Sequence, residues 1–90
     1  MDKAKVKLEI EKLKIKMNQV KDNHKKINDN HKVQLEGMKK HLASQSLPNA
    51  KKSAKNRIEM KKFEMANAKK IQTSEIESIK NQIEKLKKMV

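Results

Sequence analysis

The sequence contains no cysteine, tryptophan or tyrosine, and it has one phenylalanine, one glycine and one proline. The absence of cysteine excludes disulfides, thiol nucleophiles and cysteine-ligated zinc. The single aromatic side chain, Phe63, argues against a large globular core and against stacking on unpaired bases. The single glycine, Gly37, excludes a glycine-rich phosphate loop. The single proline, Pro48, predicts one sharp turn.

Long apolar runs are also missing, because 39% of the residues are charged and 34% are hydrophobic. We expect no membrane span and no signal peptide, and therefore a cytoplasmic protein. No Ser-His-Asp arrangement or metal-ligand pattern is recognisable. We expect neither an enzyme nor a protein with a cofactor, a bound metal or a small-molecule substrate. The composition is also typical of disorder, but the helical periodicity of the chain favours a folded structure.

The N-terminal half has a heptad pattern, in which apolar residues recur in alternating steps of four and three. This spacing predicts a helix over about 2–43, with an apolar seam that faces another helix. Asp2 is a suitable N-terminal cap. From His24 onward the seam becomes half polar. Its members are Val6, Ile10, Leu13, Met17, Val20, His24, Ile27, His31, Gln34, Met38 and His41.

Other features of this half allow alternatives. Apolar and charged residues alternate around Leu8 and Ile15, which is a strand pattern, but the intervening Lys and Glu favour a helix. Leu8 and Ile15 lie opposite the seam, either as scattered surface residues or as a second buried face. Gly37 costs about 1 kcal/mol relative to alanine in a helix, so it marks either a weak point or an early end.

The stretch over 44–49 predicts the turn, because Pro48 interrupts a helix and disfavours helical geometry at the residue before it. Ser46 and Asn49 are candidate caps for a second helix over about 50–89. That helix ends in a strong seam of Ile76, Ile79, Ile83, Leu86 and Val90. Its weaker first half joins out of phase near Gln72, which favours a heptad stutter in one helix over a break at 72–74.

Together these patterns predict an all-α fold, with residues 1–90 as a single antiparallel helical hairpin of the coiled-coil type. Folding back at the turn places the two strongest seams side by side. One seam buries little area for so many charges, so we expect two hairpins to associate as a four-helix dimer. The expected oligomer or partner seam consists of Val6, Ile10, Leu13, Met17, Val20, Ile76, Ile79, Ile83 and Leu86.

The formal charge of +13 predicts attraction to polyanions. Between residues 39 and 62 there are eight positive residues and one negative residue, Glu59, a net charge of +7 beside the turn. This basic tip is either a solvated face or a binding surface that contacts phosphates as point charges and reads no sequence. The candidate polyanion-binding residues are Lys39, Lys40, Lys51, Lys52, Lys55, Arg57, Lys61 and Lys62.

All three histidines, His24, His31 and His41, lie on the predicted seam of the first helix. His24 and His31 are about two turns apart, near 10.5 Å along the axis, too far to ligate one metal within a chain. The interpretations left open are a polar seam that sets register and oligomer state, and a pH-sensitive seam, because clustered imidazoles would resist charging inside an interface.

These observations predict a non-enzymatic, homodimeric helical hairpin that binds a polyanion, with nucleic acid or a nucleoprotein as the leading partner. The alternative is a coiled-coil adaptor, chaperone or inhibitor that binds an acidic protein surface or a partner helix. In that case mutations at the apolar residues Leu8, Ile15, Met60 and Phe63 would have the larger effect.

Overall fold

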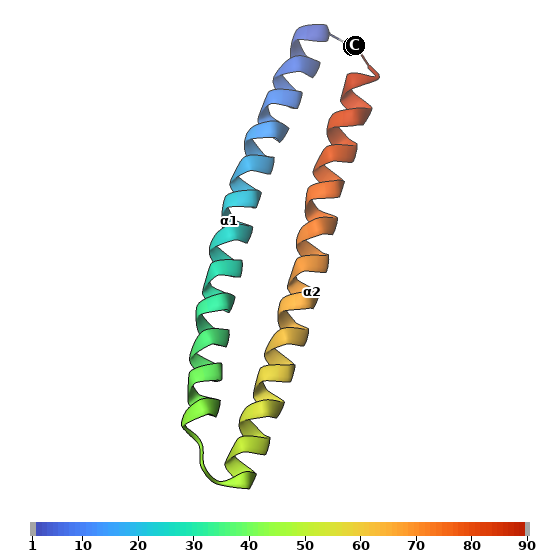
Figure 1. The fold of residues 1–90 in the computed structure, drawn as a ribbon. Coiled ribbons are helices and arrows are strands. Elements are labelled where there is room, and N and C mark those ends of the chain that lie inside the picture. Colours follow the sequence, from blue (N-terminus) through green and yellow to red (C-terminus); the bar gives the residue numbers. More distant parts are fainter. Residues whose placement is uncertain (1, 90) are drawn as a thin grey trace. The chain divides into compact units, whose positions relative to one another are not determined.

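A computed structural model describes residues 2–89. They contain two helices, α1 (Lys3–Ser44) and α2 (Pro48–Lys87). The turn between them, over 45–47, is the green loop in Figure 1. The predicted all-α helical hairpin is confirmed. Neither helix of the described residues is long and apolar enough to cross a membrane.

The helix ends follow from local chemistry. Asp2 caps α1, because its Oδ1 accepts a hydrogen bond from the Ala4 amide at 3.0 Å and its carbonyl accepts one from Val6 at 3.1 Å. Helix α2 begins at Pro48, slightly before the expected start, with the Leu47 carbonyl accepting from the Lys51 amide at 3.0 Å. Proline suits the first helical position, because its fixed φ is helical and an amide there would have no helical partner.

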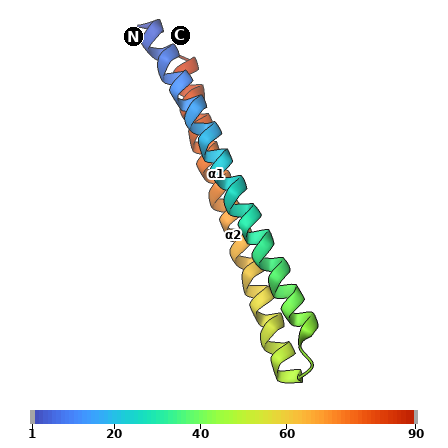
Figure 2. The ribbon, with the colours of Figure 1, turned by 90° about the vertical axis from the view of Figure 1, so that its left-hand side faces the viewer.

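The chain divides into two compact units, each containing part of both helices. The terminal unit comprises residues 2–25 and 71–89, and the turn unit comprises 26–70. In the turn unit the helices run antiparallel, because Gln34 contacts Lys61 and the later Glu64 contacts the earlier His31. In both Figure 1 and Figure 2 the two helical segments of this unit lie side by side.

The terminal unit has the aliphatic core that the seams predicted. Val6, Ile10, Ile79 and Ile83 are buried in one cluster. Four half-buried residues pack against this cluster: Leu13, Met17, Val20 and Leu86. Ile76 is half-buried as well, and Val90 lies outside the described residues. Leu8 and Ile15 are more than half exposed, so they form no second buried face within the chain.

The seam of the turn unit differs from the strict heptad prediction. The buried and half-buried positions of α1 take two successive steps of four at Val20, His24 and Asn28. This stutter moves Ile27, Gln34 and His41 out of the seam, and Asn28, Leu35 and Leu42 replace them. The stutter exchanges Ile27 for Asn28, but it also packs two leucines in place of Gln34 and His41, so its net effect is to bury more apolar area.

Helix α2 contains a stutter of the same kind. Its seam positions take two successive steps of four at Ala68, Gln72 and Ile76. The helix is uninterrupted through residues 72–74. A stutter re-phases the apolar stripe without any break in backbone hydrogen bonding.

Gly37 lies inside α1, so it neither ends nor breaks the helix. A Cβ built at this position meets nothing within 4 Å. We therefore expect Gly37→Ala to raise the free energy of unfolding by about 0.5–1 kcal/mol, because alanine loses less backbone entropy in a helix. Urea unfolding followed by circular dichroism measures the change. A destabilised variant would show that the glycine is needed for packing.

Candidate polyanion-binding surface

The seam of the turn unit is defined by the buried and half-buried residues that face the opposite helix. In α1 these are Asn28, His31, Leu35, Met38 and Leu42. In α2 they are Ala50, Ala54, Ile58, Lys61, Met65 and Ala68. Each residue of a helix is rotated by about 100° from the one before it. Residues immediately before and immediately after a seam position therefore lie on opposite flanks of the hairpin.

The flank that follows the seam is rich in lysine, and we call it the lysine flank. Its lysines are Lys32, Lys39, Lys51, Lys55, Lys62 and Lys69, all exposed. Its acidic residues are Asp29, Glu36 and Glu59. Lys39 lies 3.8 Å from Glu36 in an exposed ion pair, which contributes about 0–1 kcal/mol and leaves the lysine able to exchange partners.

The opposite flank, which precedes the seam, carries almost no charge, and we call it the neutral flank. Its residues in the turn unit are Ile27, Asn30, Gln34, Gly37, His41, Asn49, Ser53, Arg57, Met60, Glu64 and Asn67, all exposed. Among these described positions, Arg57 and Glu64 are the only Arg, Lys, Asp or Glu residues.

The eight basic residues expected to form one tip are thus distributed over different surfaces. Lys39, Lys51, Lys55 and Lys62 share the lysine flank. Lys40 and Lys52 are exposed on the outer face, the side of each helix turned away from the opposite helix. Arg57 lies on the neutral flank. The structure divides the basic tip rather than gathering it on one face.

Lys61 corrects the prediction in another way, because its side chain is buried between the helices. Its Nζ donates a hydrogen bond to Gln34 Oε1 and lies 3.7 Å from Glu64 Oε2. The long aliphatic stem of a lysine can fill a seam position while its ammonium reaches polar partners at the edge. Lys61 is therefore a packing residue and is unavailable to an external polyanion.

Each half-buried histidine has a glutamate on the opposite helix, which the sequence analysis missed. In the terminal unit, His24 Nε2 lies 3.3 Å from Glu75 Oε2. In the turn unit, His31 Nε2 lies 4.0 Å from Glu64 Oε1. The acid-sensitive seam was expected from clustered imidazoles, whereas in the structure each of these two imidazoles lies beside a carboxylate of the opposite helix.

His41 is exposed and lies outside the seam. Its ring is 3.2 Å from Gln45 Nε2, and its carbonyl accepts a hydrogen bond from Ser44 Oγ at 2.7 Å. It therefore takes part in the C-terminal end of α1 rather than in a histidine cluster. Within residues 2–89, no three His, Asp or Glu side chains gather in a way that would hold a metal ion.

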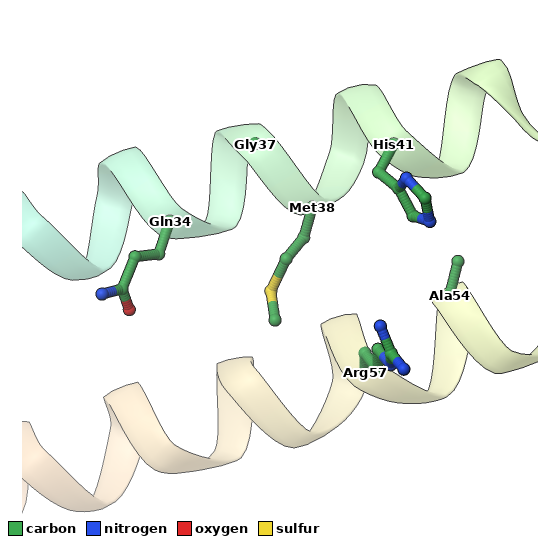
Figure 3. A pocket seen from close by; sticks show the side chains of 6 residues that line it. All are labelled: Gln34, Gly37, Met38, His41, Ala54 and Arg57. Carbon is green, nitrogen blue, oxygen red and sulfur yellow. The ribbon is translucent and has the colours of Figure 1, made fainter.

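An open hollow of about 450 Å³ lies between the helices of the turn unit. Figure 3 shows its lining side chains, with those of α1 directed toward α2. Met38 and Ala54 belong to the seam, and the others belong to the neutral flank. The lining residues are Gln34, Gly37, Met38, His41, Ala54 and Arg57. The hollow therefore opens on the neutral flank, away from the lysines.

Comparisons with protein-family models, with curated proteins and with solved structures find no match to this chain. The functional interpretation consequently depends on the two flanks of the turn unit.

Proposed function

We propose that this protein is a non-enzymatic helical hairpin that binds a polyanion through the lysine flank of its turn unit. The leading partner class is nucleic acid or a nucleoprotein. The observation that carries the proposal is the set of exposed lysines on one flank, with Lys40 and Lys52 beside them on the outer face.

The spacing of these lysines suits a repeating anion. Lys55 and Lys62 are seven residues apart on α2, as are Lys32 and Lys39 on α1, a separation of about 10.5 Å along each helix. Duplex DNA carries one negative charge per about 1.7 Å of its axis, so its phosphates are dense on the scale of this spacing. Lysines act as point charges on the backbone, so we expect binding without sequence preference.

Salt dependence tests this proposal. We expect binding to a duplex of arbitrary sequence to weaken with salt. The slope of log K against log salt should be about −4, which corresponds to roughly four or five bound phosphates at about −0.9 each. Fluorescence anisotropy at several salt concentrations measures the slope. A slope near zero, or no binding at low salt, would exclude the proposed function.

The second candidate is an adaptor that binds an acidic protein surface or a partner helix, and the hollow on the neutral flank favours the partner helix. Duplex DNA presents phosphates and grooves but no projecting apolar side chain to fill such a hollow. A polyglutamate peptide that displaces the labelled duplex at equal charge concentration would favour an acidic protein partner.

We also propose that the protein acts as a homodimer of hairpins, a four-helix bundle. Its support is the low apolar content of the seam in the turn unit, where buried positions are occupied by Ala54, Ile58 and Lys61. Such a seam gains stability from additional helices.

A further inference from the structure

We infer that the neutral flank of the turn unit is the face on which a second copy of this chain docks. This inference rests on the proposed homodimer and is independent of polyanion binding. Three features of this flank favour a second copy of the chain as its partner: its charge, its shape and the self-complementary arrangement of its residues.

Charge restricts where two copies can meet. Each chain carries a formal charge of +13, and two lysine flanks brought together would repel each other. The neutral flank holds one positive and one negative residue in the turn unit, Arg57 and Glu64. Of the two flanks, it is the one that a second cationic hairpin can approach at low electrostatic cost.

Shape supplies the second argument. The hollow of about 450 Å³ opens on this flank, and its wall at Gly37 presents backbone without a side chain (Figure 3). The same flank carries exposed apolar side chains, since Met60 is 73% exposed and Ile27 is 45% exposed. One surface therefore holds both a recess and projecting apolar groups, which is the requirement for a two-fold interface in which each copy fills the other.

The charged residues fit the same symmetry. Arg57 and Glu64 are seven residues apart on one side of α2, so an antiparallel second α2 can place its own Glu64 opposite Arg57 and its own Arg57 opposite Glu64. Glu64 is already near Lys61 and His31 of its own hairpin, at 3.7 and 4.0 Å. Docking on the neutral flank leaves the lysine flank of each copy exposed.

Introducing lysines on one flank or on the other tests the inference. The double variant Asn30→Lys with Ser53→Lys adds two charges to the neutral flank and leaves the Lys61–Gln34 hydrogen bond in place. The matched variant Ala43→Lys with Ala66→Lys adds two charges to the lysine flank, since these alanines follow Leu42 and Met65. All four positions are exposed on helices, and lysine is a good helix former. Circular dichroism checks that both variants remain helical.

Sedimentation equilibrium measures the oligomeric state against the chain mass of 10.5 kDa. We expect a dimeric wild type, a neutral-flank variant whose dimer dissociation constant rises at least about tenfold, and a control that changes less than about threefold. The absence of native cysteine allows a second measurement. A Met60→Cys variant should be captured as a dimer by a short bis-maleimide, and Ala66→Cys should not.

Several results would overturn the inference. A monomeric wild type would do so, as would equal weakening of the dimer by both double variants. Capture through Ala66→Cys in preference to Met60→Cys would place the interface on the lysine flank. Binding of a leucine-glutamate helical peptide to a monomeric protein, lost in the neutral-flank variant, would assign this face to an acidic partner helix instead. Duplex binding by the lysine flank can persist in each case, so the two proposals fail separately.

Discussion

Replacing Ile79 with alanine is expected to lower the free energy of unfolding by about 2–5 kcal/mol. Ile79 is 5% exposed and belongs to the buried cluster of the terminal unit with Val6, Ile10 and Ile83. Alanine removes three carbons from this cluster and leaves a space that two helices can close only in part. The loss therefore combines transfer free energy with the cost of a cavity.

Ile71→Ala is the matched control for this prediction. Ile71 is in the same helix and the same unit, but it is 62% exposed. We expect its stability to change by less than about 0.5 kcal/mol, because little burial is lost and alanine has the higher helix propensity. Urea unfolding followed by circular dichroism compares the two variants. Equal losses would show that the Ile79 cluster does not stabilise the hairpin.

The sequence was sufficient to predict the helices, the turn and the aliphatic cluster. Asp2 and Pro48 have specific roles at helix starts. Ile79, Ile83 and Leu86 of α2 follow one helical stripe and pack with aliphatic residues of α1. Where apolar residues occupy successive seam positions and charged residues surround them, one register buries far more apolar area than any other. The periodicity of the terminal unit therefore determines its packing.

The register of the turn unit could not be derived from a strict heptad. Around His24 two seams compete, one through Gln34 and His41 and the other through Leu35 and Leu42. Each of these two seams contains polar residues, so the periodicity of apolar residues gives only a weak preference for one seam over the other. The available signal was the pair of leucines, Leu35 and Leu42, seven residues apart. A single stutter suffices to bring them into the seam.

The division of the basic tip into surfaces depends on this register. Lys61 and Lys62 are adjacent in the sequence, and nothing in their composition distinguishes the buried lysine from the exposed one. Only the positions of Ile58 and Met65 in the seam place Lys61 between the helices. The same register separates Arg57 from the lysines, so a prediction from charge counting alone grouped residues that lie on different surfaces.

Reversing three charges on the lysine flank, with Lys51→Glu, Lys55→Glu and Lys62→Glu, is expected to weaken duplex binding at least about hundredfold at low salt. Each reversal removes a charge-assisted hydrogen bond to a phosphate, for which about 1.5 kcal/mol is a moderate value, and adds repulsion. Binding should weaken alike for all duplex sequences, and the salt slope should become shallower by about 1 for each phosphate that the variant no longer binds.

The control must separate local binding from net charge. Reversing Lys5, Lys16 and Lys80, all exposed in the terminal unit, changes the net charge by the same amount and leaves the lysine flank intact. We expect this control to weaken binding far less, mainly through long-range attraction that salt screens. Arg57→Glu alone should also have a small effect, because Arg57 lines the hollow on the neutral flank. Both triple variants could instead lose affinity equally and have the same slope of log K against log salt. Binding would then depend on net charge, and the lysine flank would not be a defined site.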